Sequence, residues 1–246
     1  KNYENFLSRL PQLINIYDAE GYNYAKHVFD VKSEFVANSA TGAVDVVMTT
    51  IDGAPIHYTL DGTEPTAASP VCDSILTIKE SCTLKAVAVR PTGNSKMLTE
   101  QIAFSKSTSK PIKANQPVNK QYEFGGVSTL VDGLKGNGNY KTGRWIAFYK
   151  NDLDVTIDLQ QPTEISSVAF SIEVSDDDKT FTKVASEAYP EMKETDRNGL
   201  YEHKLTFDPV KTRYVKVIAT SEHSIPAWHG GKGNPGFLFV DEITLN

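Results

Sequence analysis

The chain has 246 residues and a formal net charge of −6, with 31 acidic against 25 basic side chains. This balance argues against a general nucleic-acid binder, which needs clustered positive charge to displace counterions from phosphates. The longest apolar run falls far short of the roughly 20 residues that cross a bilayer, so we expect no membrane span. The two cysteines are too few for a disulfide framework, so packing must supply the core.

Residues 1–31 carry a helical pattern. One apolar stripe at helical spacing is formed by Phe6, Leu7, Leu10, Leu13, Ile14 and Tyr17. Pro11 interrupts the stripe, which predicts a kink or a break between two short helices. A lone amphipathic helix must bury its stripe on another domain. Because the sequence opens inside this pattern, we expect the chain to be a piece of a longer protein.

Residues 32–108 show the period of two that is typical of strands. Leu84, Ala86 and Ala88 alternate with their neighbours, and Asp61-Gly62 is a turn signal. Short strands with no helix among them predict a small immunoglobulin- or fibronectin-like β-sandwich. The polar run 105–111 is the best candidate for a linker. Cys72 and Cys82 lie around one short strand, so we favour two free thiols over a disulfide.

Residues 109–246 form a second β region. Alternating stretches around Val155–Leu159 and Val215–Ala219 predict strands, and the glycine-rich loops 132–138 and 230–236 lie between strands. Short strands joined by long irregular loops predict a β jelly roll with function at the loop end. The fold class is therefore mainly β, with one short N-terminal helical segment.

Two acidic motifs invite a catalytic or metal-binding reading. Asp241 and Glu242 are adjacent in the last expected strand, where successive side chains point to opposite faces, so they diverge instead of flanking one sugar. Asp176-Asp177-Asp178 precedes an aromatic residue and is more typical of a solvated hairpin turn than of a metal site. The sequence contains no nucleophile motif and no zinc spacing. We expect no catalytic residue.

The middle region resembles a known family. The string Ile56-His-Tyr-Thr-Leu-Asp-Gly-Thr-Glu-Pro-Thr66, followed by Thr83-Leu-Lys-Ala-Val-Ala88, resembles the small β-sandwich that follows the catalytic barrel of bacterial β-N-acetylhexosaminidases, or chitobiases. Residues 1–31, with Arg9-Leu10 and Tyr22-Asn-Tyr-Ala25, look like the last helix and tail of such a family 20 glycoside hydrolase barrel.

The last region resembles a discoidin domain. The carrying segments include Val131-Asp-Gly133, Gly143-Arg-Trp145, Val155–Leu159, Ser175–Phe181, Arg213–Val217 and Phe239–Ile243. This is the coagulation factor 5/8 type C fold, similar to family 32 carbohydrate-binding modules. Discoidin domains usually have another strand at the position that corresponds to the junction of residues 170 and 171 in this sequence. Either this chain has lost that strand, or the printed sequence omits a stretch.

The resemblances imply a non-catalytic C-terminal part of a secreted bacterial β-N-acetylhexosaminidase. They imply glycan ligands with terminal N-acetylhexosamine or galactose-type sugars, the missing N-terminal barrel as a partner in the same chain, and an extracellular or periplasmic location. The parent would be a glycoside hydrolase. The alternative is a purely structural or oligomerisation module without a glycan ligand.

The discoidin resemblance also implies a structural calcium ion and no cofactor for catalysis. In such domains calcium is held by an Asp-Gly loop and by an acid of the last strand, positions that Asp132 and Glu242 match. Calcium wants six to eight oxygens, and the backbone of the 133–139 loop could supply several. The alternative is that Asp132 only caps a turn.

Sugar binding requires exposed aromatic rings beside polar side chains, because the ring stacks on the C–H face and the polar groups bind the hydroxyls. The loop candidates are Tyr140, Arg144, Trp228, His229, Asn234 and Phe237. Trp145 precedes a strand and is expected to fill the floor of the domain. For Trp228 two roles stay open: a structural plug that packs inside its own domain, or a contact to the sugar.

Overall fold

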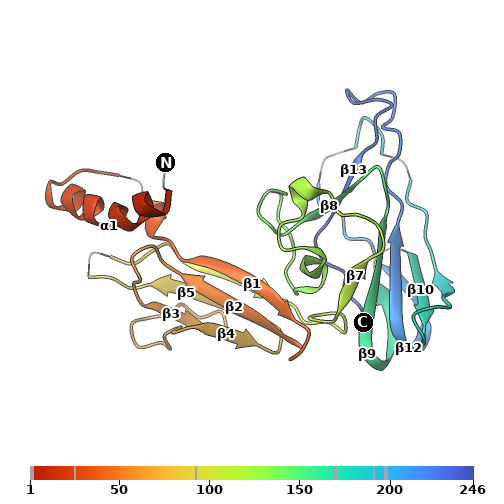
Figure 1. Cartoon of the computed structure of the whole chain (residues 1–246), viewed down its shortest axis with the longest axis horizontal. Coiled ribbons are helices and arrows are strands. Elements are labelled where there is room, and N and C mark those ends of the chain that lie inside the picture. Colours follow the sequence, from red (N-terminus) through yellow and green to blue (C-terminus); the bar gives the residue numbers. More distant parts are fainter. Residues whose placement is uncertain (1–2, 25, 92, 169–170, 191, 197–198) are drawn as a thin grey trace. The chain divides into compact units, whose positions relative to one another are not determined.

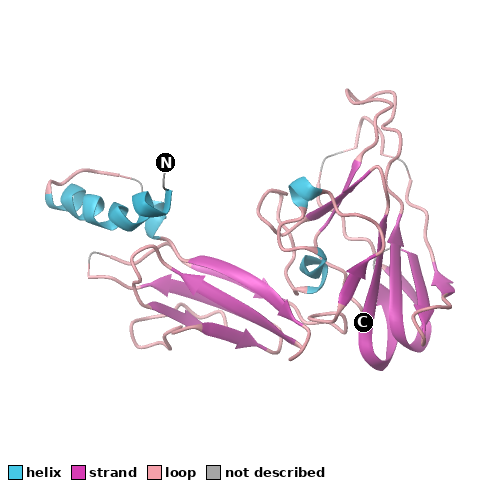
Figure 2. Cartoon of the chain, viewed as in Figure 1, coloured by secondary structure: helices cyan, strands magenta, loops and turns pink. Residues whose placement is uncertain are grey.

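The computed structural model describes residues 3–24, 26–91, 93–168, 171–190, 192–196 and 199–246. The chain divides into two compact units: the first contains residues 1–35 and 45–102, and the second contains residues 36–44 and 103–246. Strands dominate both units, and the one α-helix of the described residues lies near the N-terminus, which confirms the mainly β prediction (Figure 2). Within the same described residues, no helix has the length and apolarity that crossing a bilayer demands.

The first unit combines one helix with two three-stranded sheets (Figure 1). The sheet orders are β1-β2-β4 and β3-β5-β6. The elements are α1 (Tyr3–Ala19), β1 (Lys32–Asn38), β2 (Ala43–Thr49), β3 (Ile56–Thr59), β4 (Ile75–Ile78), β5 (Cys82–Ala88) and β6 (Leu98–Ile102). The strand expected here is confirmed as β5, and Leu84, Ala86 and Ala88 are completely buried, but Val87 between them is buried too, so the alternation is incomplete.

Helix α1 runs through Pro11, so of the two expected alternatives, a kink or a break, the break is wrong. A break would create two helices of about two turns each and add a full set of unpaired backbone groups, which costs more than the single hydrogen bond that proline removes. Of the expected apolar stripe, Ile14 is buried, whereas Phe6, Leu13 and Tyr17 remain 37–48% exposed.

Strand register keeps the two cysteines apart. The backbone N–H of Cys72 donates to the carbonyl of Ile56, and Ile56 pairs with Ala88 at one end of β5. Cys82 is the first residue of β5, at the end opposite to Ala88. Six residues, or about 20 Å along the strand, separate Cys82 from Ala88. Both thiols are free, as the sequence favoured, but they are only half-buried.

The second unit packs a five-stranded sheet against a two-stranded one (Figure 1). The sheet orders are β11-β10-β12-β9-β7 and β13-β8. The strands are β7 (Ile112–Ala114), β8 (Ile146–Tyr149), β9 (Leu153–Val168), β10 (Ser171–Ser175), β11 (Thr182–Ala185), β12 (Leu205–Ala219) and β13 (Phe237–Val240). Two short 3-10 helices, Lys120–Tyr122 and Val127–Val131, precede β8. Side chains from both sheets form one hydrophobic core.

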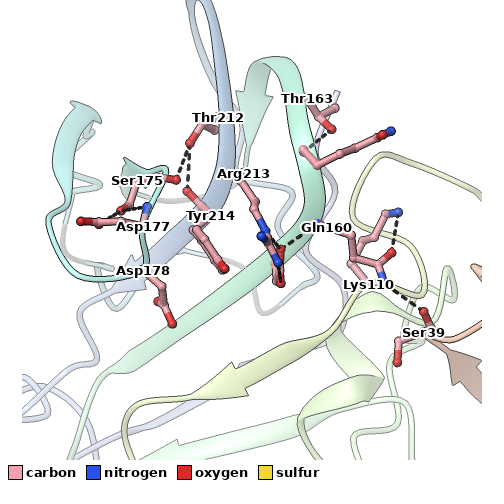
Figure 3. Close-up of polar contacts among 12 residues, drawn as sticks. Ser39, Lys110, Gln160, Thr163, Ser175, Asp177, Asp178, Thr212, Arg213 and Tyr214 are labelled. Atoms are coloured by element: carbon pink, nitrogen blue, oxygen red, sulfur yellow. Dashed lines mark hydrogen bonds and ion pairs between the residues drawn. The ribbon is translucent and has the colours of Figure 1, made fainter.

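The two longest strands, β9 and β12, are antiparallel neighbours and carry the alternation predicted from the sequence. Val155, Ile157 and Val215 are completely buried. On the outer face, Arg213 donates two hydrogen bonds of 2.8 and 2.9 Å to Asp158 (Figure 3). The further strand expected between residues 170 and 171 borders residues 169–170, which lie outside the described residues.

The acidic run 176–178 forms the predicted turn between β10 and β11. One carboxylate oxygen of Asp177 accepts hydrogen bonds of 2.9 Å from the backbone N–H groups of both Lys179 and Thr180. These bonds, together with one from the Ser175 hydroxyl, lower the pKa of Asp177 to about 2. The carboxylate therefore organises the turn (Figure 3).

The polar run 105–111, expected to be a linker, belongs to the second unit, and its central residues are buried. Ser107, Thr108 and Ser109 are at most 3% exposed. Their hydroxyls satisfy buried backbone groups: Ser107 Oγ donates to the carbonyl of Ile243 at 2.6 Å and accepts from the N–H of Leu245 at 3.1 Å. Short hydroxyl side chains can pair with the backbone, so a polar run can be buried.

Candidate functional site

The two-stranded sheet β8–β13 presents aromatic rings on one face. Phe237 and Phe239 are two residues apart in β13, so they share a face, while Val240 points into the core. Phe237 pairs across the sheet with Tyr149, and their rings stack with centroids 4.5 Å apart. The rings of Phe237 and Phe239 are 5.7 Å apart.

Three further rings join this face from the preceding loops. Tyr122 ends a 3-10 helix, and its ring lies 4.9 Å from that of Phe239 and 5.6 Å from that of Phe237. Tyr140 lies 5.0 Å from Phe239, and Phe124 lies 6.4 Å from Tyr122. We call the set the aromatic platform; it consists of Tyr122, Phe124, Tyr140, Tyr149, Phe237 and Phe239.

The platform faces solvent although it is apolar. Phe124, Tyr140 and Phe237 are 44–51% exposed. Single exposed apolar residues are ordinary, but contiguous exposed rings mark binding surfaces. Lys141 Nζ lies 5.9 Å from the ring centroid of Tyr140, and Lys150 Nζ lies 5.3 Å from that of Tyr149. The platform therefore combines stacking surfaces with positive charge.

A pocket of about 780 Å³ shares Tyr140 and Phe239 with the platform. Its volume falls within the roughly 300–1,000 Å³ of small-molecule sites. Trp145 and Leu238 form apolar walls of the pocket. Glu202 places a carboxylate at the pocket, and its Oε2 forms an ion pair of 3.1 Å with Lys135 Nζ.

The glycine-rich loop 133–138 shapes one wall of this pocket. Trp145 is buried and donates from Nε1 to the carbonyl of Asn137 at 3.0 Å, so the prediction that it fills the floor of the domain is confirmed. Gly136 lies against the indole and donates its N–H to Asp241 at 2.7 Å. A side chain at position 136 would occupy the space of the indole.

Two of the six expected sugar-binding residues, Tyr140 and Phe237, lie in the platform. Trp228, His229 and Asn234 lie instead in the 222–236 loop, which closes on itself through hydrogen bonds between Ile225 and both Gly233 and Asn234. Trp228 is 42% exposed, its ring lies 5.6 Å from that of His229, and it is therefore no buried plug.

The acidic residues expected to bind a metal lie close together beneath the glycine loop. Burial raises the pKa of Asp132 to about 7, although its bond from the N–H of Leu134 and the charge of Arg144, the sixth expected sugar-binding residue, oppose the rise. Burial and the neighbouring charge of Asp132 raise the pKa of Glu242 well above its usual range, and Glu242 accepts from the N–H of Gly133 at 3.3 Å.

These two carboxylates fit a hard cation only with help from the backbone. Among the residues that the structure describes, no three aspartate, glutamate, histidine or cysteine side chains form a metal-binding group. Two buried carboxylates of like charge favour either protonation or a bound cation. Calcium takes backbone carbonyls as readily as carboxylates, so Asp132, Glu242 and carbonyls of their loop fit this ion better than zinc.

Four platform residues were not predicted from the sequence: Tyr122, Phe124, Tyr149 and Phe239. For Phe239 a signal exists, because aromatic residues at 237 and 239 alternate with aliphatic residues at 238 and 240. Tyr122 and Phe124 carry no such signal, since only tertiary packing brings them to β13.

Comparison with known families agrees with this architecture. Residues 36–100 match the model of the chitobiase/β-hexosaminidase C-terminal domain, and residues 111–234 match that of the F5/8 type C domain. Both family resemblances predicted from motifs are thereby confirmed. No curated protein matches the chain.

Several solved structures are similar to part of this chain. A pectin-binding carbohydrate-binding module is 20% identical, with a TM-score of 0.35, and covers 60% of this chain and 92% of its own. The lectin domain of lectinolysin complexed with Lewis B antigen is 15% identical, with a TM-score of 0.40, over 58% and 96%. CpGH89CBM32-5 from Clostridium perfringens, in complex with GalNAc-β-1,3-galactose, is 17% identical, with a TM-score of 0.36, over 55% and 93%.

Proposed function

The chain belongs to the F5/8 type C domain family through residues 111–234, and from this premise we propose that its second unit binds glycans at the aromatic platform. The observation that carries the proposal is the exposure of contiguous rings on β13 and the adjoining loops. An exposed ring offers a flat apolar surface to the C–H face of a sugar, and the adjoining tyrosine hydroxyls and lysine ammonium groups offer hydrogen bonds to its rim.

The ligands we propose are glycans with terminal N-acetylhexosamine or galactose-type sugars. We also propose that the chain is the non-catalytic C-terminal part of an extracellular or periplasmic bacterial β-N-acetylhexosaminidase. The match of residues 36–100 to the hexosaminidase C-terminal domain supports this parent. In such an arrangement a weak glycan site still contributes, because it raises the local concentration of substrate beside a tethered active site.

The platform is tested by exchanging its exposed rings. Tyr140→Ala and Phe237→Ala should each weaken glycan binding about tenfold, since a lost stacking contact of about 1.4 kcal/mol corresponds to that factor. The measurement is a glycan array followed by calorimetric titration of the sugars that bind. Both side chains are about half exposed, so the fold should be retained.

Tyr22→Ala is the matched control, because Tyr22 is 64% exposed but belongs to the first unit. It should leave glycan affinity unchanged. If no glycan binds, and Phe237→Ala instead converts an oligomer to monomers in sedimentation, the platform is an assembly surface and the structural alternative holds.

We propose that Asp132 and Glu242 hold a structural calcium ion. When bound, the ion would compensate the negative charges of these two carboxylates. Without it, the raised pKa of Asp132 has a definite consequence for stability. A carboxyl whose folded pKa is about 7, against an unfolded value of about 3.9, favours the folded state fully below about pH 4, and this contribution disappears as the pH rises through about 7.

The melting temperature of chelated protein should therefore fall between pH 4 and pH 8, and calcium should restore it most strongly at the alkaline end, where both carboxylates are charged. Asp132→Asn has no proton to release at this position, so its melting temperature should fall less with pH and should not respond to calcium. Subtracting its pH profile from that of the wild type removes the contribution of the other titrating groups. Equal melting temperatures of wild type with and without calcium at pH 8 would dismiss the ion.

A further inference from the structure

We propose that the glycan ligand of the platform is anionic and carries a uronate carboxylate or a sulfate group. This inference rests on the proposed function and adds the chemical class of the sugar. Its basis is the placement of two ammonium groups over two different platform rings: Lys141 on Tyr140 and Lys150 on Tyr149.

Neither lysine forms an ion pair with a carboxylate of the described residues. The ion pairs of the described part of the chain involve other basic residues, and both Lys141 and Lys150 are exposed. The pocket next to the platform differs in this respect, because there Lys135 pairs with Glu202. Glu123 lies between the platform residues Tyr122 and Phe124 in the sequence, and its side chain is exposed. The platform thus keeps two positive charges that are available to a ligand.

The ring-bound lysines favour charged over neutral sugars. A neutral sugar that stacks on Tyr140 or Tyr149 must displace an ammonium group from the ring and offers only hydroxyls in return. An anionic sugar displaces the same group but gains a charge-assisted hydrogen bond from it. Specificity arises from this difference, since it depends on what each competitor loses as well as on what it gains.

The backbone beside the rings supports a functional reading of the surface. Lys150 has φ 66 and Phe124 has φ 28, both in the left-handed region that non-glycine residues seldom adopt. Such conformations carry a cost and concentrate at binding sites. At Lys150 this conformation accompanies the position of the ammonium group over the preceding ring.

Two matched pairs of oligosaccharides test the proposal by calorimetric titration of the full chain. The first pair is a galacturonate hexasaccharide and its carboxyl-reduced counterpart; the second is a sulfated galactan hexasaccharide and its desulfated form. We expect the charged member of at least one pair to bind about tenfold more tightly at low salt, with the preference shrinking as salt rises. The pair that shows the preference identifies carboxylate or sulfate as the source of charge.

The lysines are tested directly with Lys141→Gln and Lys150→Gln, each of which should reduce the ratio of the affinities for the charged and the neutral member of a pair towards one. Lys183→Gln is the control, because Lys183 is exposed on β11 and lies over no platform ring. Unchanged melting temperatures would show that the variants are folded.

The outcomes separate this inference from the proposed function. Equal affinity within both pairs, or binding of only the neutral array sugars, overturns the anionic ligand and leaves glycan binding intact. Failure of every sugar overturns the proposed function as well. Exposed rings beside lysines also suit an anionic lipid surface, so co-sedimentation with phosphatidylserine vesicles that depends on Lys141 and Lys150, without sugar binding, would replace the glycan by a membrane.

Discussion

Gly136 is the position where one missing side chain determines the shape of the site. A Cβ atom at this residue would lie 2.2 Å from the nearest carbon of the Trp145 indole, far inside van der Waals contact. Trp145 cannot retreat easily, because it is buried and hydrogen-bonded to Asn137. The glycine therefore serves close packing between loop and floor, and its N–H also binds Asp241.

Gly136→Ala should lower the free energy of unfolding by about 1–3 kcal/mol, the usual effect of overpacking a fixed core contact. Gly138→Ala is the matched control, because nothing lies within 4 Å of a Cβ atom there. Guanidinium denaturation of both variants measures the difference. Equal midpoints would mean that Trp145 is free to move aside.

At the scale of elements, the segment 105–109, whose residues 107–109 are buried, connects the C-terminal tail to the core of the second unit. Ser107 bonds both Ile243 and Leu245, and the backbone N–H of Lys106 donates to the carbonyl of Leu245 at 2.9 Å. Ile243 and Leu245 are completely buried, although no strand partner is assigned to the tail in the described residues. The serine hydroxyl thus pairs two backbone groups of the tail, in addition to the backbone hydrogen bonds that the tail makes with Leu130, Ser166 and Ser167.

Ser107→Ala should destabilise the protein by about 1–3 kcal/mol, because it leaves a buried carbonyl and a buried N–H unpaired. Ser128→Ala removes a hydroxyl bond of 3.1 Å to Gly125 in a more exposed place and should cost clearly less. Urea unfolding curves of the two variants give the comparison. A Ser107 variant as stable as the Ser128 one would show that water or a backbone shift satisfies the tail.

The strands were predictable from the sequence where one face of the strand is buried and the other is partly exposed to solvent. In β12 the period of two over residues 215–219 follows directly from alternate burial, and the turn at 176–178 follows from its acidic residues. The break allowed for at Pro11 is wrong, because the cost of extra helix ends outweighs local propensity. The burial of residues 107–109 was not predicted, because it depends on hydroxyl bonds to distant backbone groups.

For the whole molecule, the two β modules carried motifs specific enough to identify their families from the sequence alone. The site was harder to predict. Tyr140 and Phe237 were expected as loop aromatics, but the platform also needs Tyr122 and Phe124, more than 100 residues before β13. Their proximity to Phe237 results from packing between loops, which leaves no periodic trace in the sequence. Trp228 and His229, two further loop candidates, lie in the 222–236 loop.

Mapping the ligand onto individual rings tests glycan binding at the platform most directly. Aromatic resonances of selectively labelled tyrosine, phenylalanine and tryptophan would be followed by NMR during titration with a galactose-type oligosaccharide. We predict shifts for Tyr140, Phe237 and Phe239, with Tyr22 and Trp228 unaffected. Shifts confined to Trp228 and its loop, or none for any sugar that binds, would contradict the account.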